Sequence, residues 1–320
     1  MTSRKDLTLM EIMRKFSTEE AARLYLEDIR WPHGPVCPHC ENDDHERIYT
    51  IHENKGRKVR KGLYKCGDCL QQFTVTVGTI FESSHIPLNK WLIAFYTMCA
   101  SKTQISALQL QRELEIGSYR TAWFMCHRIR FALVEPSDEL LDGYVEADET
   151  YVGGVAHGHG QAYTGNKVPV VSLVERGGRV RSQIVEKVTG EELTKILRER
   201  LSPTAHLNTD ELTGYTKVGS TFASHDTVKH SANEYVRHDA STGRTATTNT
   251  IEGYFGNTKM SIEGTHHGVS RKHLGLYLAE FDYKYNTRKL TDGERTSMGI
   301  KMVGGKRLKL HAKGGNLVEK

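Results

Sequence analysis

Two Cys-x-x-C pairs constrain the fold of this 320-residue chain more than any other feature. Cys37 and Cys40 form the first pair, Cys66 and Cys69 form the second, and residues 41–65 separate them. Each pair presents two thiolates from one tight turn, and two such turns close a tetrahedral Zn²⁺ site. Disulfides are the weaker alternative in a reducing compartment. Because four thiolates leave no open position, we expect the zinc to hold the fold and not to perform chemistry.

Short alternating stretches surround the two pairs, at residues 47–51, 63–65 and 72–77. This pattern predicts a zinc ribbon over residues 31–84, preceded by a helical N-terminal segment over residues 1–30. His39 lies inside the first pair but is surplus to the four sulfurs. Cys99 and Cys126 fall in helical patterns, where a buried free thiol is the expected state.

Charge and hydropathy limit the class of protein. The formal net charge is +5, which only weakly indicates a polyanionic partner. Cations cluster at residues 55–65 and 301–313, where either run is a solvated loop or a nucleic-acid contact. The second run lies in a predicted basic C-terminal tail, residues 291–320. The longest apolar stretch, residues 91–100, is about half of a membrane span, and no signal peptide is evident. We therefore expect a soluble, cytoplasmic protein without a membrane partner.

Three helical patterns fill residues 85–135. The second and third, joined by a turn at Gly117, have the proportions of a helix-turn-helix. The third carries basic residues among aromatic ones, namely Arg120, His127, Arg128 and Arg130. An ordinary helical pair is the alternative. Beside a zinc ribbon we favour DNA binding, with Arg128 or Arg130 reading a base.

Residues 143–154 read as one strand of about nine residues, ended by two glycines. Alternation places Glu146 and Asp148 on one face and Glu149 on the other. A buried carboxylate requires a metal ion, a cation or water as a partner. The alternative is an edge strand with solvated acids.

The remainder of the chain alternates strand and helix. We expect strands at 167–174 and 179–188 around a glycine hairpin, a helix to Leu201, and a strand ending at Asp210. We also expect a fifth strand at 228–237 and a flexible loop at 239–248. In a helix from Thr248, three polar side chains share one face, namely Asn249, Glu252 and Lys259. This order is that of an α/β, ribonuclease-H-like fold over residues 140–290, whose acids converge on two divalent ions. A solvated helix face with unconnected charges is the alternative reading of the last helix, and His157 and His159 most simply belong to a polar loop.

Three blocks resemble the catalytic blocks of bacterial insertion-sequence transposases of the fifteen-ninety-five family, which are DDE enzymes with an N-terminal zinc ribbon. The blocks are Glu-Ala-Asp-Glu-Thr-Tyr-Val-Gly-Gly (146–154), Asn-Thr-Asp-Glu (208–211) and Thr-Asn-Thr-Ile-Glu-Gly-Tyr-Phe (248–255) with Lys259. The resemblance spans roughly residues 20–290. It implies that Asp148 and Asp210 are the first two catalytic acids. For the third position, Glu252 has the acid-to-lysine spacing of DDE enzymes, whereas similar proteins with asparagine there point to Asn249.

The resemblance implies a transposase that uses Mg²⁺ or Mn²⁺, ions selected by oxygen ligands. Its partners would be double-stranded DNA, both element ends and target, on which it would assemble as a homo-oligomer. Two other classes remain open. A ribonuclease-H-like nuclease would use the same acids, and a domesticated zinc-ribbon DNA-binding regulator would bind without catalysis.

Overall fold

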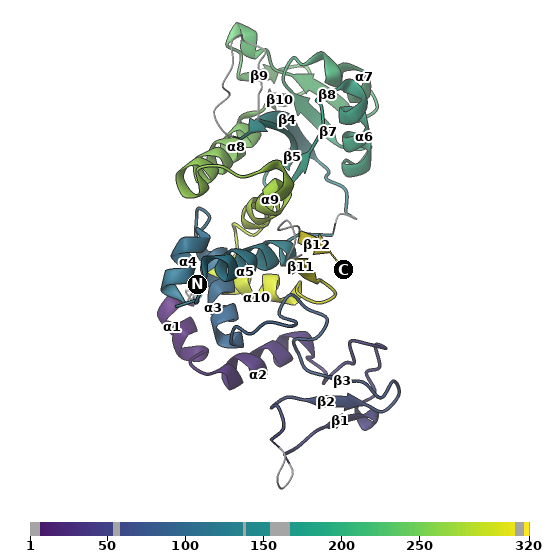
Figure 1. The fold of residues 1–320 in the computed structure, drawn as a ribbon. Coiled ribbons are helices and arrows are strands. Elements are labelled where there is room, and N and C mark those ends of the chain that lie inside the picture. Colours follow the sequence, from purple (N-terminus) through teal and green to yellow (C-terminus); the bar gives the residue numbers. More distant parts are fainter. Residues whose placement is uncertain (1–6, 54–57, 137–138, 154–166, 311–316, 320) are drawn as a thin grey trace, which may run out of the picture. The chain divides into compact units, whose positions relative to one another are not determined.

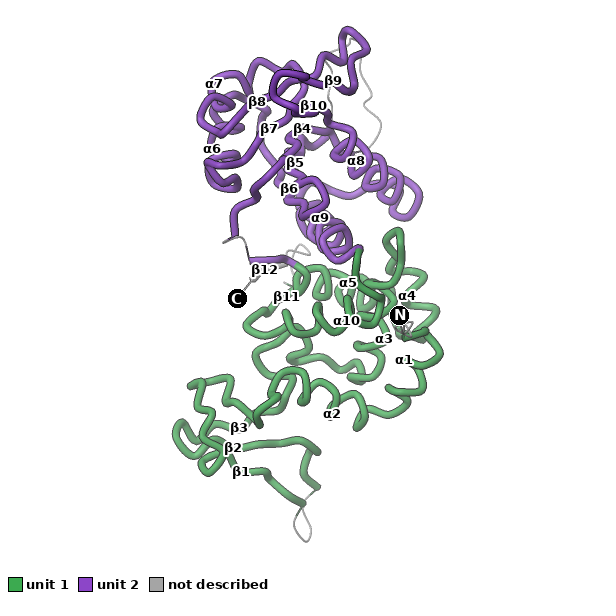
Figure 2. The backbone as a smooth tube through the Cα atoms, turned by 180° about the vertical axis from the view of Figure 1, so that it is seen from behind, with its two compact units in different colours: residues 1–133, 289–320 green, residues 134–288 purple. Residues whose placement is uncertain are grey.

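The computed structural model describes residues 7–53, 58–136, 139–153 and 167–310, and the backbone of 317–319. The chain divides into two compact units (Figure 2). Unit 1 comprises residues 1–133 and 289–320, and unit 2 comprises residues 134–288. This division differs from the five consecutive segments that the sequence predicts, because the end of the chain returns to unit 1.

Unit 2 is built on a five-stranded mixed sheet in the order β6-β5-β4-β7-β8 (Figure 1). The strands are β4 (Tyr144–Val152), β5 (Val168–Glu175), β6 (Val180–Ile184), β7 (His206–Thr209) and β8 (Ser224–Thr227). Strands β4, β5 and β6 are antiparallel neighbours, whereas β7 lies parallel to β4 and β8 parallel to β7. The nine-residue strand that carries Asp148 and the hairpin after β5 are confirmed. Gly177, at φ +73°, supplies the left-handed residue of that hairpin.

Helices cover both faces of this sheet (Figure 1). On one face lie α6 (Gly190–Arg200), the 3₁₀ turn η2 (Thr213–Tyr215) and α7 (Thr216–Gly219); on the other lie α8 (Asn249–Ser261), the π-helical turn η4 (Ile262–His266) and α9 (Arg271–Asn286). Leu193, Leu197 and Tyr215 pack on Val145 and Ala147 in the first core. The second core holds Val152, Val170, Ile251, Phe255 and Leu278. Alternating β4 side chains therefore enter two different cores, as period 2 requires.

The segment between β8 and α8 differs from prediction. The fifth strand lies at Ser224–Thr227 and not at residues 228–237, because this polar stretch pairs with β7 at the edge of the sheet, where its residues are only partly buried. Residues 228–248 instead form a 3₁₀ turn η3 (His230–Ala232) and a hairpin of β9 (Val236–Asp239) and β10 (Arg244–Thr247). The predicted loop at 239–248 thus contains a strand. The glycine- and histidine-rich segment with His157 and His159 lies outside the described residues.

Unit 1 combines a small ribbon with a helical group. The ribbon contains η1 (His45–Arg47), β1 (Ile48–Thr50), β2 (Tyr64–Cys66) and β3 (Gln72–Phe73), paired antiparallel. The helices are α1 (Leu9–Lys15), α2 (Glu19–Arg30), α3 (Leu88–Ala100), α4 (Ala107–Glu113) and α5 (Tyr119–Ala132). Ser118 caps α5 by accepting from the backbone N–H of Thr121. Helices α4 and α5 are therefore the helical pair that the sequence predicts at 105–133.

The C-terminal segment is folded and is not the basic tail that the sequence predicts. Helix α10 (Asp292–Lys301) starts with a capping box at Thr291 and packs on α3 and α2. Strands β11 (Leu308–Leu310) and β12 (Leu317–Glu319) pair antiparallel after it. Buried Ile300 and Val303 account for this: they anchor the segment in the core of unit 1 despite the surrounding lysines. In the described part of the chain, no helix combines the length and apolar character that a bilayer span requires.

Candidate metal centres and functional site

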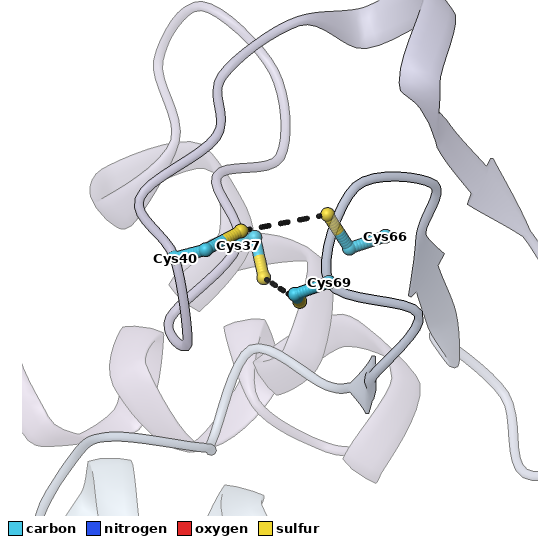
Figure 3. A group of neighbouring side chains, drawn as sticks. All are labelled: Cys37, Cys40, Cys66 and Cys69. Atoms are coloured by element: carbon cyan, nitrogen blue, oxygen red, sulfur yellow. Dashed lines mark hydrogen bonds between the residues drawn. The ribbon is translucent and has the colours of Figure 1, made fainter.

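The four predicted cysteine ligands of unit 1 converge in the structure (Figure 3). The Sγ atoms of Cys37 and Cys69 lie 3.6 Å apart, as do those of Cys40 and Cys66, and all four lie within 4.8 Å of one another. Sulfurs on one tetrahedral zinc lie about 3.8 Å apart, given Zn–S bonds of about 2.3 Å. The cluster therefore fits structural zinc, whereas His39 is exposed and takes no part.

Both cysteine turns have the same backbone geometry. The residue after the second cysteine of each pair adopts a positive φ, 60° at Glu41 and 62° at Leu70. In each turn the N–H of the first cysteine donates to the carbonyl five residues on, from Cys37 to Asn42 and from Cys66 to Gln71. The backbone N–H of Cys69 is the main reason that the pKa of Cys66 is lowered, to about 6. A thiol that ionises this easily is a good metal ligand.

A second cluster lies in unit 2, where β4 and β7 run side by side. Asp148 is in the middle of β4, and Asp210 follows the last residue of β7. One carboxylate oxygen each of Asp148, Glu149 and Asp210 lies within 4.8 Å of the others. Oxygens on one Mg²⁺ lie about 3–4 Å apart, given ligand distances of about 2.1 Å. These three carboxylate oxygens would therefore have to move only slightly closer together to bind one such ion.

The electrostatics of Asp148 reflect this crowding. Burial and then the charge of Glu149 raise the pKa of Asp148 to about 7, with smaller contributions from Asp210 and Glu252. The backbone N–H of Glu149 donates to Asp148 Oδ1 at 2.7 Å and opposes that rise. Carboxylates that repel one another in this way are stabilised when a cation binds between them.

Glu149 was not among the site residues that the sequence predicts. Alternation points it to the α6 side of the sheet, where the buried Tyr215 hydroxyl donates to Glu149 Oε2 at 2.9 Å. Burial is the main reason that the pKa of Glu149 is raised. The charge pattern of the strand shows two adjacent acids, but only the turn of the chain after β7 brings Asp210 within reach of both.

The residues predicted for the third position lie on α8. Glu252 is in its first turn, Asn249 is its exposed first residue, and Lys259 lies exposed further along the helix. Glu252 is not part of the close group formed by the two aspartates and Glu149, although its charge acts on Asp148. Its Oε1 instead accepts from the Thr248 hydroxyl at 3.1 Å and lies 3.3 Å from His230 Nε2. The metal and catalytic roles of Glu252, Asn249 and Lys259 stay predictions.

Helix α8 is fixed to β4 by the buried carboxylate of Glu146, which is 0% exposed. Its oxygens accept from the backbone N–H groups of Thr250 and Ile251, at 2.8 and 3.0 Å, and from the Thr250 hydroxyl at 2.9 Å. Arg176 pairs with it at 2.7 Å and donates onward to the carbonyls of Thr245 and Thr247. A negative charge at a helix N-terminus is favourable, so Glu146 is a strong anchor between the strand of Asp148 and the helix of Glu252.

Beyond these acids, β4 and α8 border a cavity of about 290 Å³. Tyr151, Val152 and Gly153 line it from the strand, and Lys259 lines it from the helix. Its other lining residues are Lys167, Ile262, Glu263, His267 and Gly268. Lys167, just before β5, and Lys259 bring two cations to this cavity, against the one carboxylate of Glu263.

The predicted DNA-reading residues of α5 are not available for that role. Arg128 is 5% exposed and Arg130 is 1% exposed. Arg128 donates to the carbonyl of Glu82 at 2.7 Å, and its guanidinium lies 5.2 Å from the Trp91 ring. Burial lowers the pKa of Arg128 to about 10. The prediction that these two arginines face DNA is therefore wrong, whereas Arg120, in the first turn of α5, is exposed.

Part of the second basic run also has internal partners. Arg307 pairs with Glu82 at 2.7 Å, and Lys306 donates to the carbonyl of Ala132 at 2.6 Å. These cations therefore attach the segment before β11 to the end of α5 and to the turn before α3.

Two family matches cover the two clusters. Residues 17–72 match the transposase zinc-ribbon domain, and residues 140–286 match the ISXO2-like transposase domain. A protein in the transposable element ISH50 of Halobacterium salinarum is 30% identical over 290 residues, spanning 85% of this chain and 92% of that protein. A chain of the Drosophila P element transposase strand transfer complex is 12% identical with a TM-score of 0.25. That match covers 69% of this chain and 65% of the other chain, and at this score it supports no conclusion.

The two domain matches and the Halobacterium salinarum relative identify the chain as a transposase with a zinc-ribbon domain and a DDE domain. The chain belongs to the IS1595 family of insertion-sequence transposases.

Proposed function

We propose that this protein binds the inverted-repeat ends of an insertion sequence and catalyses metal-dependent DNA cleavage and strand transfer. One observation carries the proposal. The carboxylates of Asp148 on β4 and Asp210 after β7 lie close together, where these two strands run parallel, in a domain of the transposase family. Three antiparallel strands followed by two parallel ones support a ribonuclease-H-like fold for unit 2. In such a fold the acids gather at the end of the central strands.

Asp148 and Asp210 would hold Mg²⁺ or Mn²⁺, with Glu252 as the third acid. Bound divalent ions supply activation of an attacking water or 3′-hydroxyl and stabilisation of the leaving 3′-oxygen. The protein residues hold this centre in place. Tyr215 orients Glu149 beside the aspartates, and Glu146 fixes the helix of Glu252.

Lys259 would contact a DNA phosphate. Its place in the cavity with Lys167 and His267, on the continuation of the β4 and α8 surfaces, supports this role. Unit 1 would recognise element ends through the zinc ribbon and the exposed start of α5, with Arg120 replacing the buried arginines. Cations on the ribbon hairpin would add salt-dependent phosphate contacts. The active form would be a homo-oligomer assembled on double-stranded DNA.

Incubation of the full chain with labelled element ends, target DNA and Mg²⁺ tests the proposal. We expect strand-transfer products from the wild type and none from Asp148→Asn or Asp210→Asn, with end binding retained by both variants. Cleavage without strand transfer would identify a nuclease instead. Binding without any cleavage would identify a regulator.

The third acid requires a comparison between two neighbours on α8. We expect Glu252→Gln to abolish strand transfer, because it removes a charge that already acts on Asp148. Asn249→Ala should have the smaller effect, since Asn249 is exposed at the start of the helix. Normal strand transfer by Glu252→Gln together with an inactive Asn249→Ala would assign the third position to Asn249.

A further inference from the structure

The loop between β8 and β9 is attached to the residue that follows Asp210. The carboxylate of Glu211 accepts from the backbone N–H groups of His230 and Ser231, at 2.7 and 3.0 Å. These hydrogen bonds are the main reason that the pKa of Glu211 is lowered, so the carboxylate is ionised when it holds the loop. The backbone of His230 is thereby placed relative to Asp210.

The imidazole of His230 reaches in the other direction, toward α8. Its Nε2 lies 3.3 Å from Glu252 Oε1 and 3.1 Å from Thr248 Oγ1. The Thr248 hydroxyl donates to the same Glu252 oxygen at 3.1 Å. The Tyr235 ring lies against the imidazole, with centroids 5.3 Å apart and planes inclined by 32°. His230 is therefore held by its backbone and by a neighbouring ring while its Nε2 faces the carboxylate.

We infer that His230 is a positioning residue for the third catalytic acid. It fixes the Glu252 carboxylate toward the aspartates and links it, through Glu211, to the strand end that carries Asp210. The inference rests on the proposed role of Glu252. A glutamate side chain is otherwise free to rotate, so orienting it before a cation binds removes part of the ordering that binding requires.

An isolated ion pair at the surface would contribute little, and the side chains of His230 and Glu252 are 31% and 40% exposed. Two features distinguish this contact from such a pair. A hydroxyl and a ring restrain the same imidazole, and the partner carboxylate acts on the charge of Asp148. The partial exposure is useful in an experiment, because replacement of His230 leaves both hydrophobic cores of unit 2 intact.

Calorimetric titration of Mn²⁺ into the full-length, zinc-loaded protein tests the inference without DNA. We expect His230→Ala to weaken Mn²⁺ binding about 10-fold, the lower end of the usual effect of removing an orienting partner. Glu252→Gln should weaken it at least as much. The double variant should bind no more weakly than Glu252→Gln alone, because His230 then has no carboxylate to orient. His230→Gln should restore most of the affinity, since its amide nitrogen takes the place of Nε2.

His238 is the matched control. It lies on β9, in the same segment between β8 and α8, and its Nδ1 is 2.9 Å from the Thr245 hydroxyl, so His238→Ala also removes a histidine–threonine contact. We expect wild-type Mn²⁺ affinity from this variant.

Two results would overturn the inference alone. They are unchanged affinity in His230→Ala, and an equal loss from His230→Ala in the wild-type and Glu252→Gln backgrounds. Failure of the wild type to bind Mn²⁺, or wild-type affinity in Asp148→Asn, would instead refute the metal centre of the proposed function and the inference with it.

Discussion

Because burial and neighbouring charges raise the pKa of Asp148 to about 7, protons and divalent ions compete for this carboxylate near neutral pH. In the unfolded chain its pKa returns to the ordinary value of 3.8. At a pH between 3.8 and 7, Asp148 therefore takes up a proton when the protein folds. The contribution of Asp148 to stability is fully present below pH 3.8 and is lost as the pH rises through 7.

Asp148→Asn should remove this dependence. Without added Mg²⁺ or Mn²⁺, we expect the variant to be more stable than the wild type by ~4 kcal/mol at pH 8, and the difference to vanish near pH 4. Urea unfolding of the zinc-loaded proteins at the two pH values measures it. Saturating Mg²⁺ should reverse the order at pH 8, because only the wild type gains from binding the ion. A stability difference that does not change with pH would contradict the assigned pKa.

At the scale of single residues, the sequence predicts those that belong to a recognisable pattern of neighbouring residues in the chain. The two Cys-x-x-C pairs and Asp148 belong to local patterns, and the structure places each of them in a cluster. Glu149 and His230 have no such signal. Glu149 meets Asp210 only because β7 pairs with β4, and His230 reaches Glu252 only because Glu211 holds its loop.

At the scale of elements, α5 shows how a basic helix can be part of a core. Its arginines have aliphatic stems that pack against apolar surface, and backbone carbonyls accept from the charged end, as Glu82 does for Arg128. Sequence periodicity cannot distinguish this arrangement from a DNA-facing stripe, because the accepting carbonyl lies far away in the chain. The sequence does not predict the edge strand at Ser224–Thr227 for a related reason: its strand character comes from pairing with β7 and not from its residue types.

Arg128→Ala should therefore act on stability and not on sequence recognition. We expect a loss of about 2 kcal/mol in the free energy of unfolding, from lost packing and an unpaired carbonyl. Arg120→Ala, on the exposed start of the same helix, should leave stability within about 0.5 kcal/mol. Thermal unfolding and filter binding of both variants measure the two effects. Normal stability of Arg128→Ala with a selective loss of end binding would restore the base-reading interpretation.

The ribbon is expected to depend on its metal. Cys37→Ser should abolish stoichiometric zinc and end binding together, since the short strands of the ribbon have little core of their own. Elemental analysis of the purified variant and the wild type measures zinc per chain. Cys99→Ser serves as the control, because Cys99 is a buried thiol of α3 outside the cluster. A wild-type protein without zinc would contradict the assignment.

At the scale of the whole molecule, the return of the chain to unit 1 makes α10 part of the unit for which we propose recognition of the element ends. Ile300, on α10, is 0% exposed, whereas Met298 on the same helix is 45% exposed. We expect Ile300→Ala to lower the free energy of unfolding by about 2–4 kcal/mol and to weaken end binding, and Met298→Ala to change neither. Differential scanning calorimetry and DNA binding measure both. Equal, small effects of the two substitutions would show that α10 is dispensable to unit 1.

The same path of the chain has a consequence for the order of synthesis. A ribosome that has made α1 to α5 must translate all of unit 2 before α10 emerges, which takes roughly 8–30 s at ~5–20 residues per second. Unit 2 of a nascent chain, for which we propose catalysis, is therefore complete before unit 1, for which we propose binding of the element ends. A chain that ends before α10 would contain Asp148 and Asp210 but an incomplete unit 1. We expect such a truncated chain to compete poorly for DNA with the full-length protein.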